Sequence, residues 1–220
     1  MQAAVQIPNA KYPVFNPITT TVSPVNGSQR TFTIERPSEE EVNRTAGVAK
    51  EIFVNAFTKK YREYHTAAKT EQSIEEWLRL KTGVVFKDWL ETTFDEELQE
   101  YRDGKKGMIY LTDEQGRLVA WLSHSAVDEK GDVYLSQCSL EAESQDKKIA
   151  STAFAEVINT NNILTLFPGA KKLKLIARKV NTSADHLYIK AGFKRNDTIT
   201  PSDYGASYDD RYVGYQKDVS

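Results

Sequence analysis

Apolar and polar residues alternate at strand spacing in residues 31–35, which predicts a first strand. Pro37 follows, and Ser38 with Glu41 forms a capping box, in which the serine side chain accepts an N–H group of the first helical turn. Apolar residues then recur every three or four positions and predict a helix with one buried face. The residues of that face are Val42, Ala46, Ala49, Ile52, Phe53, Ala56 and Phe57.

A second helical region is expected to begin at another capping box, Ser73 to Glu76. Gly83 interrupts its pattern, and a separate short helix is expected to follow and to end before Gly104. The apolar stripe of the first part is Trp77, Leu78, Val85, Trp89 and Leu90, and that of the short helix is Phe94, Leu98 and Tyr101.

The pattern changes to strands after this point. Three strands separated by two short turns predict a hairpin that is extended by a third antiparallel strand. Their ranges are 108–112, 117–124 and 132–140, with turns at 113–116 and 128–131. An amphipathic helix over 149–158, a strand over 173–177, a helix that ends at Gly192 and two closing strands over 193–198 and 211–216 complete the expected order.

This order predicts an α/β fold with a mixed, mostly antiparallel central sheet flanked by helices. Residues 1–30 contain four prolines and no periodic apolar pattern, so we expect an extended N-terminal arm, either loosely ordered or packed across the domain. Residues 31–220 are expected to form one domain.

Charge and composition exclude several classes of function. The 220 residues carry 29 basic and 31 acidic side chains, so neither nucleic acid nor an anionic membrane is an expected partner. Cys138 is the one cysteine, and the three histidines lack ligand spacing, so no metal is expected. No apolar run is long enough to span a bilayer, and no secretory signal begins the chain, so we expect a cytoplasmic location. The oligomeric state stays open.

Residues 181–193 carry the most specific motif. Asn181, Ala184, Leu187 with Tyr188, Lys190 and Gly192 with Phe193 follow one another at a spacing that resembles the last helix of the GNAT acyltransferases. The element order over residues 31–217 resembles the same fold. The resemblance implies acetyl-CoA as co-substrate, a small-molecule or peptide amine as acceptor, and direct attack with Tyr188 as general acid. The alternative for Tyr188 is an aromatic side chain packed between helix and sheet.

The resemblance also implies where the cofactor binds. In the family, backbone N–H groups at a helix start hold the pyrophosphate, and Gln145, Lys147, Lys148, Ile149 and Ala150 occupy that loop. Lys148 replaces a glycine of the family pattern. A polar turn before an amphipathic helix is the alternative reading of this loop.

Three more residues complete the implied cofactor site. The backbone of Cys138 and Leu140 is expected to pair with the pantetheine arm where the third strand diverges from the next one, with the Cys138 amide polarising the thioester carbonyl. Asn181 is implied to contact pantetheine, besides capping its helix. A nucleophilic Cys138 is the rival reading, but no Cys/His/Asp constellation accompanies it.

The sequence does not identify the general base or the acceptor. Asp132, Glu141, Glu143 and His124 are near in sequence, and an ordered water passing the proton to one of these or to Ser136 would serve. Residues 61–65, expected to connect two helices, and residues 197–210 are implied to flank the acceptor. The carboxylates and tyrosines of the second segment favour a cationic amine. A non-catalytic acyl-CoA-binding or protein-interaction module on the same scaffold, and a longer acyl donor, are alternatives.

Overall fold

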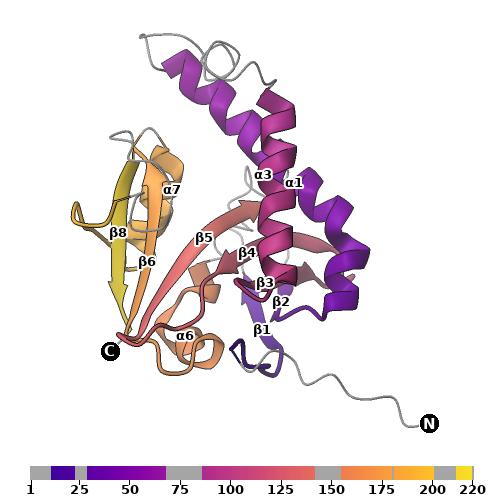
Figure 1. The fold of residues 1–220 in the computed structure, drawn as a ribbon, viewed down its shortest axis with the longest axis vertical. Helices are drawn as coiled ribbons and strands as arrows, with labels where there is room; N and C mark the ends of the chain where they lie inside the picture. The colour runs from indigo at the N-terminus through magenta and orange to yellow at the C-terminus, as the bar shows by residue number, and fades with distance from the viewer. Residues whose placement is uncertain are drawn as a thin grey trace.

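A mixed sheet with the strand order β1-β2-β3-β4-β5-β6-β8-β7 lies at the centre of the fold (Figure 1). The computed structural model describes residues 11–22, 29–67, 86–141, 155–179, 181–200 and 212–219. Its strands are β1 Ile18–Val22, β2 Arg30–Glu35, β3 Gly107–Asp113, β4 Leu118–His124, β5 Asp132–Leu140, β6 Lys172–Arg178, β7 Lys194–Arg195 and β8 Tyr212–Asp218. Neighbouring strands run antiparallel except for β5 and β6, which are parallel. The predicted fold class is therefore confirmed.

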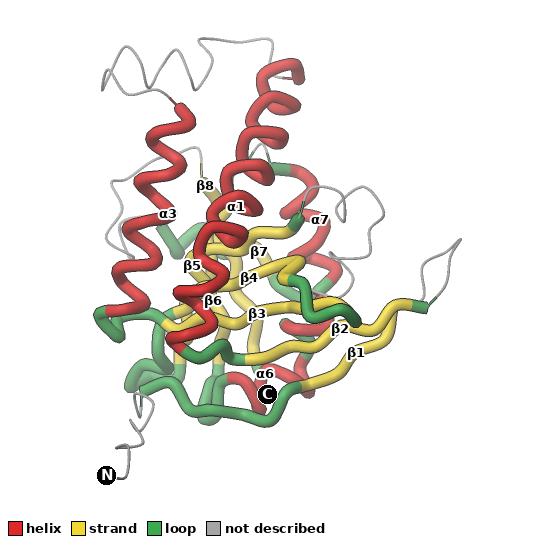
Figure 2. The backbone as a smooth tube through the Cα atoms, turned by 90° about the vertical axis from the view of Figure 1, so that its right-hand side faces the viewer, coloured by secondary structure: helices red, strands yellow, loops and turns green. Residues whose placement is uncertain are grey.

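Helices cover both faces of this sheet (Figure 2). The helices α1 Glu39–Ala67 and α3 Phe86–Arg102 pack together on one face, and α6 Thr160–Leu166 and α7 Thr182–Lys190 lie on the other. Each face has its own apolar cluster, because alternate residues of a strand point to opposite sides. Trp121 of β4 fixes α1 to the sheet by donating its indole N–H to the Ala49 carbonyl at 3.1 Å.

Local signals predicted the start of α1 correctly but divided α3 wrongly. The Ser38 hydroxyl accepts the Glu41 N–H at 3.2 Å, as the capping box requires. The helix α3 is continuous from Phe86 to Arg102, where the sequence analysis expected two helices. Thr92 and Thr93 do not interrupt it, because their hydroxyls donate to carbonyls four residues earlier and stay within the helical pattern.

Part of the expected arm belongs to the sheet. Residues Ile18–Val22 form β1 and pair antiparallel with β2, from Ile18 opposite Ile34 to Val22 opposite Arg30. The sequence analysis did not predict this strand, although all five of its residues are β-branched. The boundary between an arm over residues 1–30 and a domain over residues 31–220 stays a prediction. The strand β1, on the arm side of that boundary, belongs to the same sheet as the other strands.

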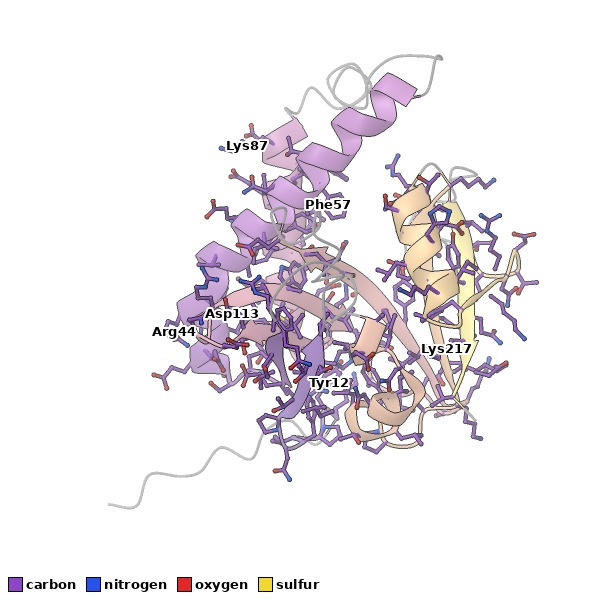
Figure 3. All side chains as sticks on the ribbon, turned by 180° about the vertical axis from the view of Figure 1, so that it is seen from behind. Tyr12, Arg44, Phe57, Lys87, Asp113 and Lys217 are labelled. Carbon is purple, nitrogen blue, oxygen red and sulfur yellow. The ribbon has the colours of Figure 1, made fainter. Side chains whose placement is uncertain are left out.

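The described segment before β1, residues 11–17, packs against the sheet (Figure 3). Tyr12 is buried and donates its hydroxyl to the Lys105 carbonyl at 2.5 Å. The Arg36 guanidinium lies 5.8 Å from the centroid of the Tyr12 ring and 5.7 Å from that of Phe15. These aromatic faces stabilise the Arg36 cation, since they supply electron-rich surfaces that replace part of its hydration.

Gly107 is required where this segment meets the sheet, and Gly107→Ala is expected to cost roughly 1–3 kcal/mol of unfolding free energy. A Cβ at residue 107 would lie 2.6 Å from two atoms of the His124 ring and 2.7 Å from Arg36 Nη1. Gly47→Ala is the matched control, because a Cβ there meets nothing within 4 Å. That control should stabilise the helix α1 by about 1 kcal/mol. Urea unfolding of both variants checks the prediction, and equal midpoints would contradict it.

Candidate active site

The strands β5 and β6 separate after a short parallel ladder. Asp132, Val133 and Tyr134 pair with residues 172–174, and the ladder ends there, although β5 continues to Leu140 and β6 to Arg178. Figure 1 shows β5 curving away from β6. The divergence that the family resemblance implied is therefore present in the sheet, and residues 135–140 form no ladder pair with β6.

A bulge on the opposite edge of β5 accounts for this curvature. Along the ladder with β4, Ser123 pairs with Gln137 and His124 with Leu135, so Ser136 is the extra residue. A bulge bends its strand and increases the local twist. It lies next to the point where β5 leaves β6, so the two irregularities are parts of one distortion.

Cys138 and Leu140 both lie in the separated part of β5. The Cys138 side chain is half-buried and packs against the apolar cluster of the α6 and α7 face, while Leu140 is buried in that cluster. Their proposed backbone roles stay predictions. Among the described residues, no group of three or more His, Cys, Asp or Glu side chains is placed to hold a metal ion.

Because the expected role of Cys138 is a backbone one, Cys138→Ala should leave acetyl-CoA affinity and turnover close to those of the unaltered protein. The alanine keeps the N–H group and removes only a half-buried thiol. Calorimetric titration with acetyl-CoA and a thiol-release assay check this expectation. A loss of turnover without a loss of stability would instead point to a nucleophilic thiol.

The helix α7 begins and ends as its motif predicts. The Asn181 side chain accepts the Ala184 N–H at 3.0 Å, which satisfies a donor of the first turn. Gly192 has a φ of 88°, and the Phe193 N–H reaches back to the Tyr188 carbonyl at 2.9 Å. Lys217 of β8 holds the C-terminal end of α7 by donating to the Ala191 carbonyl at 2.7 Å. The cap by Asn181 is confirmed, and its contact with pantetheine stays a prediction.

Tyr188 lies on α7 with its ring packed against two other aromatic rings. Its ring centroid is 5.8 Å from that of Phe193 and 5.4 Å from that of Tyr215. The Tyr215 hydroxyl donates to Asp185 at 2.7 Å, and burial raises the pKa of Tyr215 to about 12, so this neighbouring phenol stays protonated. The side chain of Tyr188 is half-buried, in keeping with packing, and its role as an acid stays a prediction.

Part of the predicted site falls on segments that the structure does not describe. Gln145, Lys147, Lys148, Ile149 and Ala150 lie outside the described residues, as does most of the segment 197–210. The prediction that residues 61–65 connect two helices is wrong, because α1 continues through them to Ala67. No glycine, proline or capping residue interrupts that stretch, so the helix has no local reason to end there.

The structure removes His124 from the candidate bases. His124 is wholly buried, its Nε2 accepts from Arg36 Nη1 at 3.1 Å, and its Nδ1–H donates to the Ser125 carbonyl at 2.7 Å. Burial, and secondarily the charge of Arg36, lower the pKa of His124 to about 3, so the ring is neutral with no lone pair left for an acceptor. Asp132 is engaged with Lys174 at 2.5 Å. Glu143 lies outside the described residues.

Glu97 of α3 is a buried carboxylate that the sequence analysis missed. One oxygen pairs with Lys106 at 2.6 Å, and the other accepts the Ser123 hydroxyl at 2.8 Å. The sequence could have indicated this residue, because Glu97 falls on the same apolar stripe of the helix as Phe94 and Leu98, where a carboxylate is unusual.

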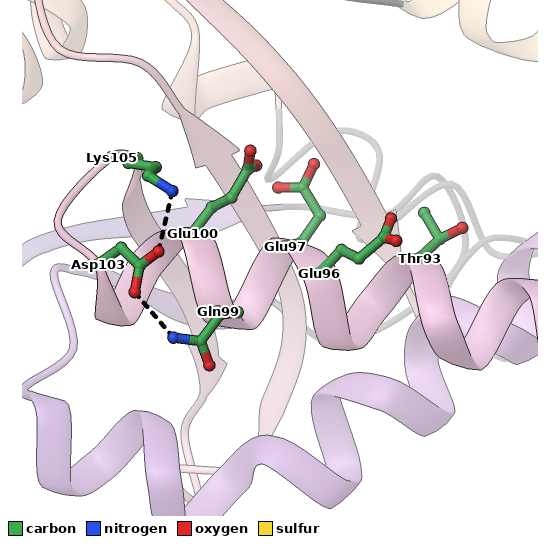
Figure 4. A pocket seen from close by; sticks show the side chains of 7 residues that line it. All are labelled: Thr93, Glu96, Glu97, Gln99, Glu100, Asp103 and Lys105. Atoms are coloured by element: carbon green, nitrogen blue, oxygen red, sulfur yellow. Dashed lines mark hydrogen bonds and ion pairs between the residues drawn. The ribbon is translucent and has the colours of Figure 1, made fainter.

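A depression of about 330 Å³ adjoins Glu97 on α3 (Figure 4). Its lining is mostly acidic, and the three exceptions are Lys105, which pairs with Asp103 at 2.9 Å, and two uncharged polar residues. The lining residues are Thr93, Glu96, Glu97, Gln99, Glu100, Asp103 and Lys105. None of the described helices is both long and apolar enough to cross a membrane.

Comparisons with known proteins agree with this architecture. The family model described as "Acetyltransferase (GNAT) family" matches residues 71–193. PaiA N-acetyltransferase from Thermoplasma acidophilum, solved in complex with coenzyme A, is 19% identical, with 85% of this chain and 98% of that chain covered and a TM-score of 0.51. An acetyltransferase of the GNAT family from Staphylococcus aureus Mu50 is 12% identical, with 86% and 99% covered and a TM-score of 0.50. Both likenesses concern the fold, and no curated protein matches the sequence.

Proposed function

The chain belongs to the GNAT acetyltransferase family, and we propose that it transfers the acetyl group of acetyl-CoA to an amine by direct attack. The observation that carries this proposal is the separation of β5 from β6 after Tyr134. An extended pantetheine arm matches a strand in length and hydrogen-bonding groups, so it can add to the edge of β5 as a further strand does.

The residues around the separation supply what acyl transfer needs. The Cys138 N–H would donate to the thioester oxygen, where negative charge develops as the amine attacks. Tyr188 would donate its phenolic proton to the departing thiolate of CoA. The new N–C bond thus replaces the C–S bond, with one proton leaving the amine and one reaching the sulfur.

The remaining cofactor contacts are proposed at the positions that correspond to the family pattern. Backbone N–H groups between Gln145 and Ala150 would hold the pyrophosphate, with Lys147 and Lys148 adding positive charge. Asn181 would contact pantetheine from the start of α7. The acceptor is a small-molecule or peptide amine, and the acidic residues of 197–210 favour a cationic one.

A non-catalytic acyl-CoA-binding or protein-interaction module is the second candidate. Lys148 favours it, because a side chain replaces the glycine that lets phosphate approach the backbone closely. The two functions differ in turnover and not in fold, so an experiment on the protein itself has to separate them.

Titration calorimetry with acetyl-CoA, followed by thiol release with a panel of amines, tests the proposal. The panel contains a polyamine, an aminoglycoside, a lysine peptide and a peptide with a free N-terminus. We expect saturable binding and release of CoA with at least one class of amine. Binding without thiol release across the panel would favour the module, and no binding at millimolar acetyl-CoA would remove the proposed acetyl transfer.

A further inference from the structure

Three side chains from three elements form a continuous hydrogen-bonded chain that begins at the bulge of β5. Ser136 Oγ lies 2.6 Å from Ser123 Oγ on β4, and Ser123 Oγ lies 2.8 Å from Glu97 Oε2 on α3. Ser136 Oγ is also 3.5 Å from the same carboxylate oxygen. Ser123 is 0% exposed and Glu97 is 7% exposed, so the bond between them is shielded from water, while Ser136 is partly exposed at the open end.

The direction of the protons in this chain follows from the chemistry of the groups. An ionised carboxylate only accepts, so Ser123 must use its single hydrogen on Glu97. Ser136 must then donate its hydrogen to Ser123, whose oxygen has lone pairs left. Each hydroxyl therefore points toward Glu97, and the lone pairs of Ser136 Oγ are left to accept an N–H group.

The open end of the chain lies beside the proposed site of reaction. Ser136 is two residues beyond the last ladder pair between β5 and β6 and two residues before Cys138. Two residues of an extended strand span about 6.6 Å, within the reach of an amine that attacks a carbonyl held at the Cys138 amide. At the bulge, the Ser136 hydroxyl lies beside that of Ser123, on the side of the sheet that α3 covers.

We propose that Glu97 takes up the proton that the acceptor amine releases, through Ser136 and Ser123. This relay rests on the proposed acetyl transfer. As the N–C bond forms, the amine proton moves to Ser136 Oγ, the Ser136 proton moves to Ser123 Oγ, and the Ser123 proton moves to Glu97 Oε2. Both serines end as hydroxyls, and Glu97 ends as a neutral acid. Tyr188 separately protonates the thiolate, so charge and atoms balance.

The surroundings of Glu97 allow the proton to leave after turnover. Lys106 faces the other carboxylate oxygen at 2.6 Å and is itself shared with Glu100 at 2.6 Å. Glu97 also lines the acidic depression on α3 (Figure 4). The carboxylate thus connects the two hydroxyls with an outer surface, and acidic neighbours there can accept the proton. The other charged groups on this side are Glu96, Asp103 and Lys105.

The test compares Glu97→Gln and Ser136→Ala with the control Ser139→Ala in steady-state thiol release. Ser139 lies on the same strand, is 1% exposed, and has a buried hydroxyl without a hydrogen-bond partner among the described residues, so its loss leaves the relay intact. The acceptor is whichever amine of the panel the unaltered protein acetylates. We expect each relay variant to lower kcat about 100-fold, as removal of a general base does, and the control to retain the rate.

The dependence of kcat/KM on pH separates a relay from a structural role. The rising limb of this profile reports the essential base of the free enzyme, so it should shift or disappear in both relay variants and persist in Ser139→Ala. Thermal unfolding of each variant shows whether the fold is intact; Ser136→Ala keeps the Glu97–Lys106 pair and serves if Glu97→Gln does not fold. An active protein whose profile and rate survive Ser136→Ala overturns the relay alone. An inactive unaltered protein overturns the proposed function and the relay with it.

Discussion

Replacing Tyr188 with phenylalanine is expected to lower kcat by about 1000-fold, within the range that positioned general acids contribute. The substitution removes one oxygen and keeps the ring that packs against Phe193 and Tyr215. Affinity for acetyl-CoA should therefore stay unchanged, because the phenol is proposed to act on the thiolate that forms during the reaction. A parallel measurement of kcat by thiol release and of affinity by calorimetry checks both halves of the expectation.

Tyr215→Phe is the matched control for this substitution. Tyr215 lies next to Tyr188, but its hydroxyl is engaged with Asp185, which Arg195 also holds at 2.8 Å. Removing that hydroxyl should reduce thermal stability modestly and leave kcat near its original value. Equal rates for Tyr188→Phe and the unaltered protein would remove Tyr188 from the mechanism. Equal losses in the two variants would mean that the two hydroxyls act by holding α7 in place and not by proton transfer.

The helix that carries Tyr188 was predictable because its signals are local. Asn181 caps the first turn, Gly192 supplies the left-handed residue, and both act within three or four residues of their own position. The capping box at Ser38 is legible for the same reason. Backbone geometry and short-range hydrogen bonds decide such features, so a single sequence contains nearly all the information about them.

The bulge and the buried carboxylate were not predictable in the same way. Ser136 is an extra residue only in the pairing of β5 with β4, and no residue type within β5 indicates a bulge there. Glu97 meets Ser123 across 26 residues and Ser136 across 39. Interactions at that sequence separation depend on how the elements pack, and the periodicity of α3 alone shows only that Glu97 occupies an apolar stripe.

The strand β1 is an intermediate case. Its residues Ile18–Val22 are all β-branched, yet the surrounding prolines and polar residues resemble a loose tail. The edge of β2 decides the outcome, because five residues of β1 pair with it. Tyr12, which precedes β1 in the chain, adds a further contact by packing against Arg36.

Acid should destabilise the folded protein between pH 6.5 and pH 5 through His124. Burial lowers the pKa of His124 from 6.5 to about 3, so in this range the unfolded chain binds a proton that the folded protein excludes. Stability contributed by a neutral histidine is complete above its unfolded pKa and is lost as the pH falls toward the folded one. Each pH unit corresponds to about 1.4 kcal/mol, so roughly 2 kcal/mol should be lost by pH 5.

The variant His124→Gln tests this origin of the acid sensitivity. Glutamine can accept from Arg36 and donate to the Ser125 carbonyl but does not titrate, so its unfolding free energy should depend less steeply on pH in this range. His186→Gln, on the exposed face of α7, should keep the original slope. Urea unfolding at pH 7, 6 and 5 measures all three slopes.

Because Arg36 stacks between Tyr12 and Phe15 and faces the His124 ring, a proton on that ring would set two buried cations against each other. Identical slopes in the unaltered protein and His124→Gln would mean that a different group carries the acid sensitivity.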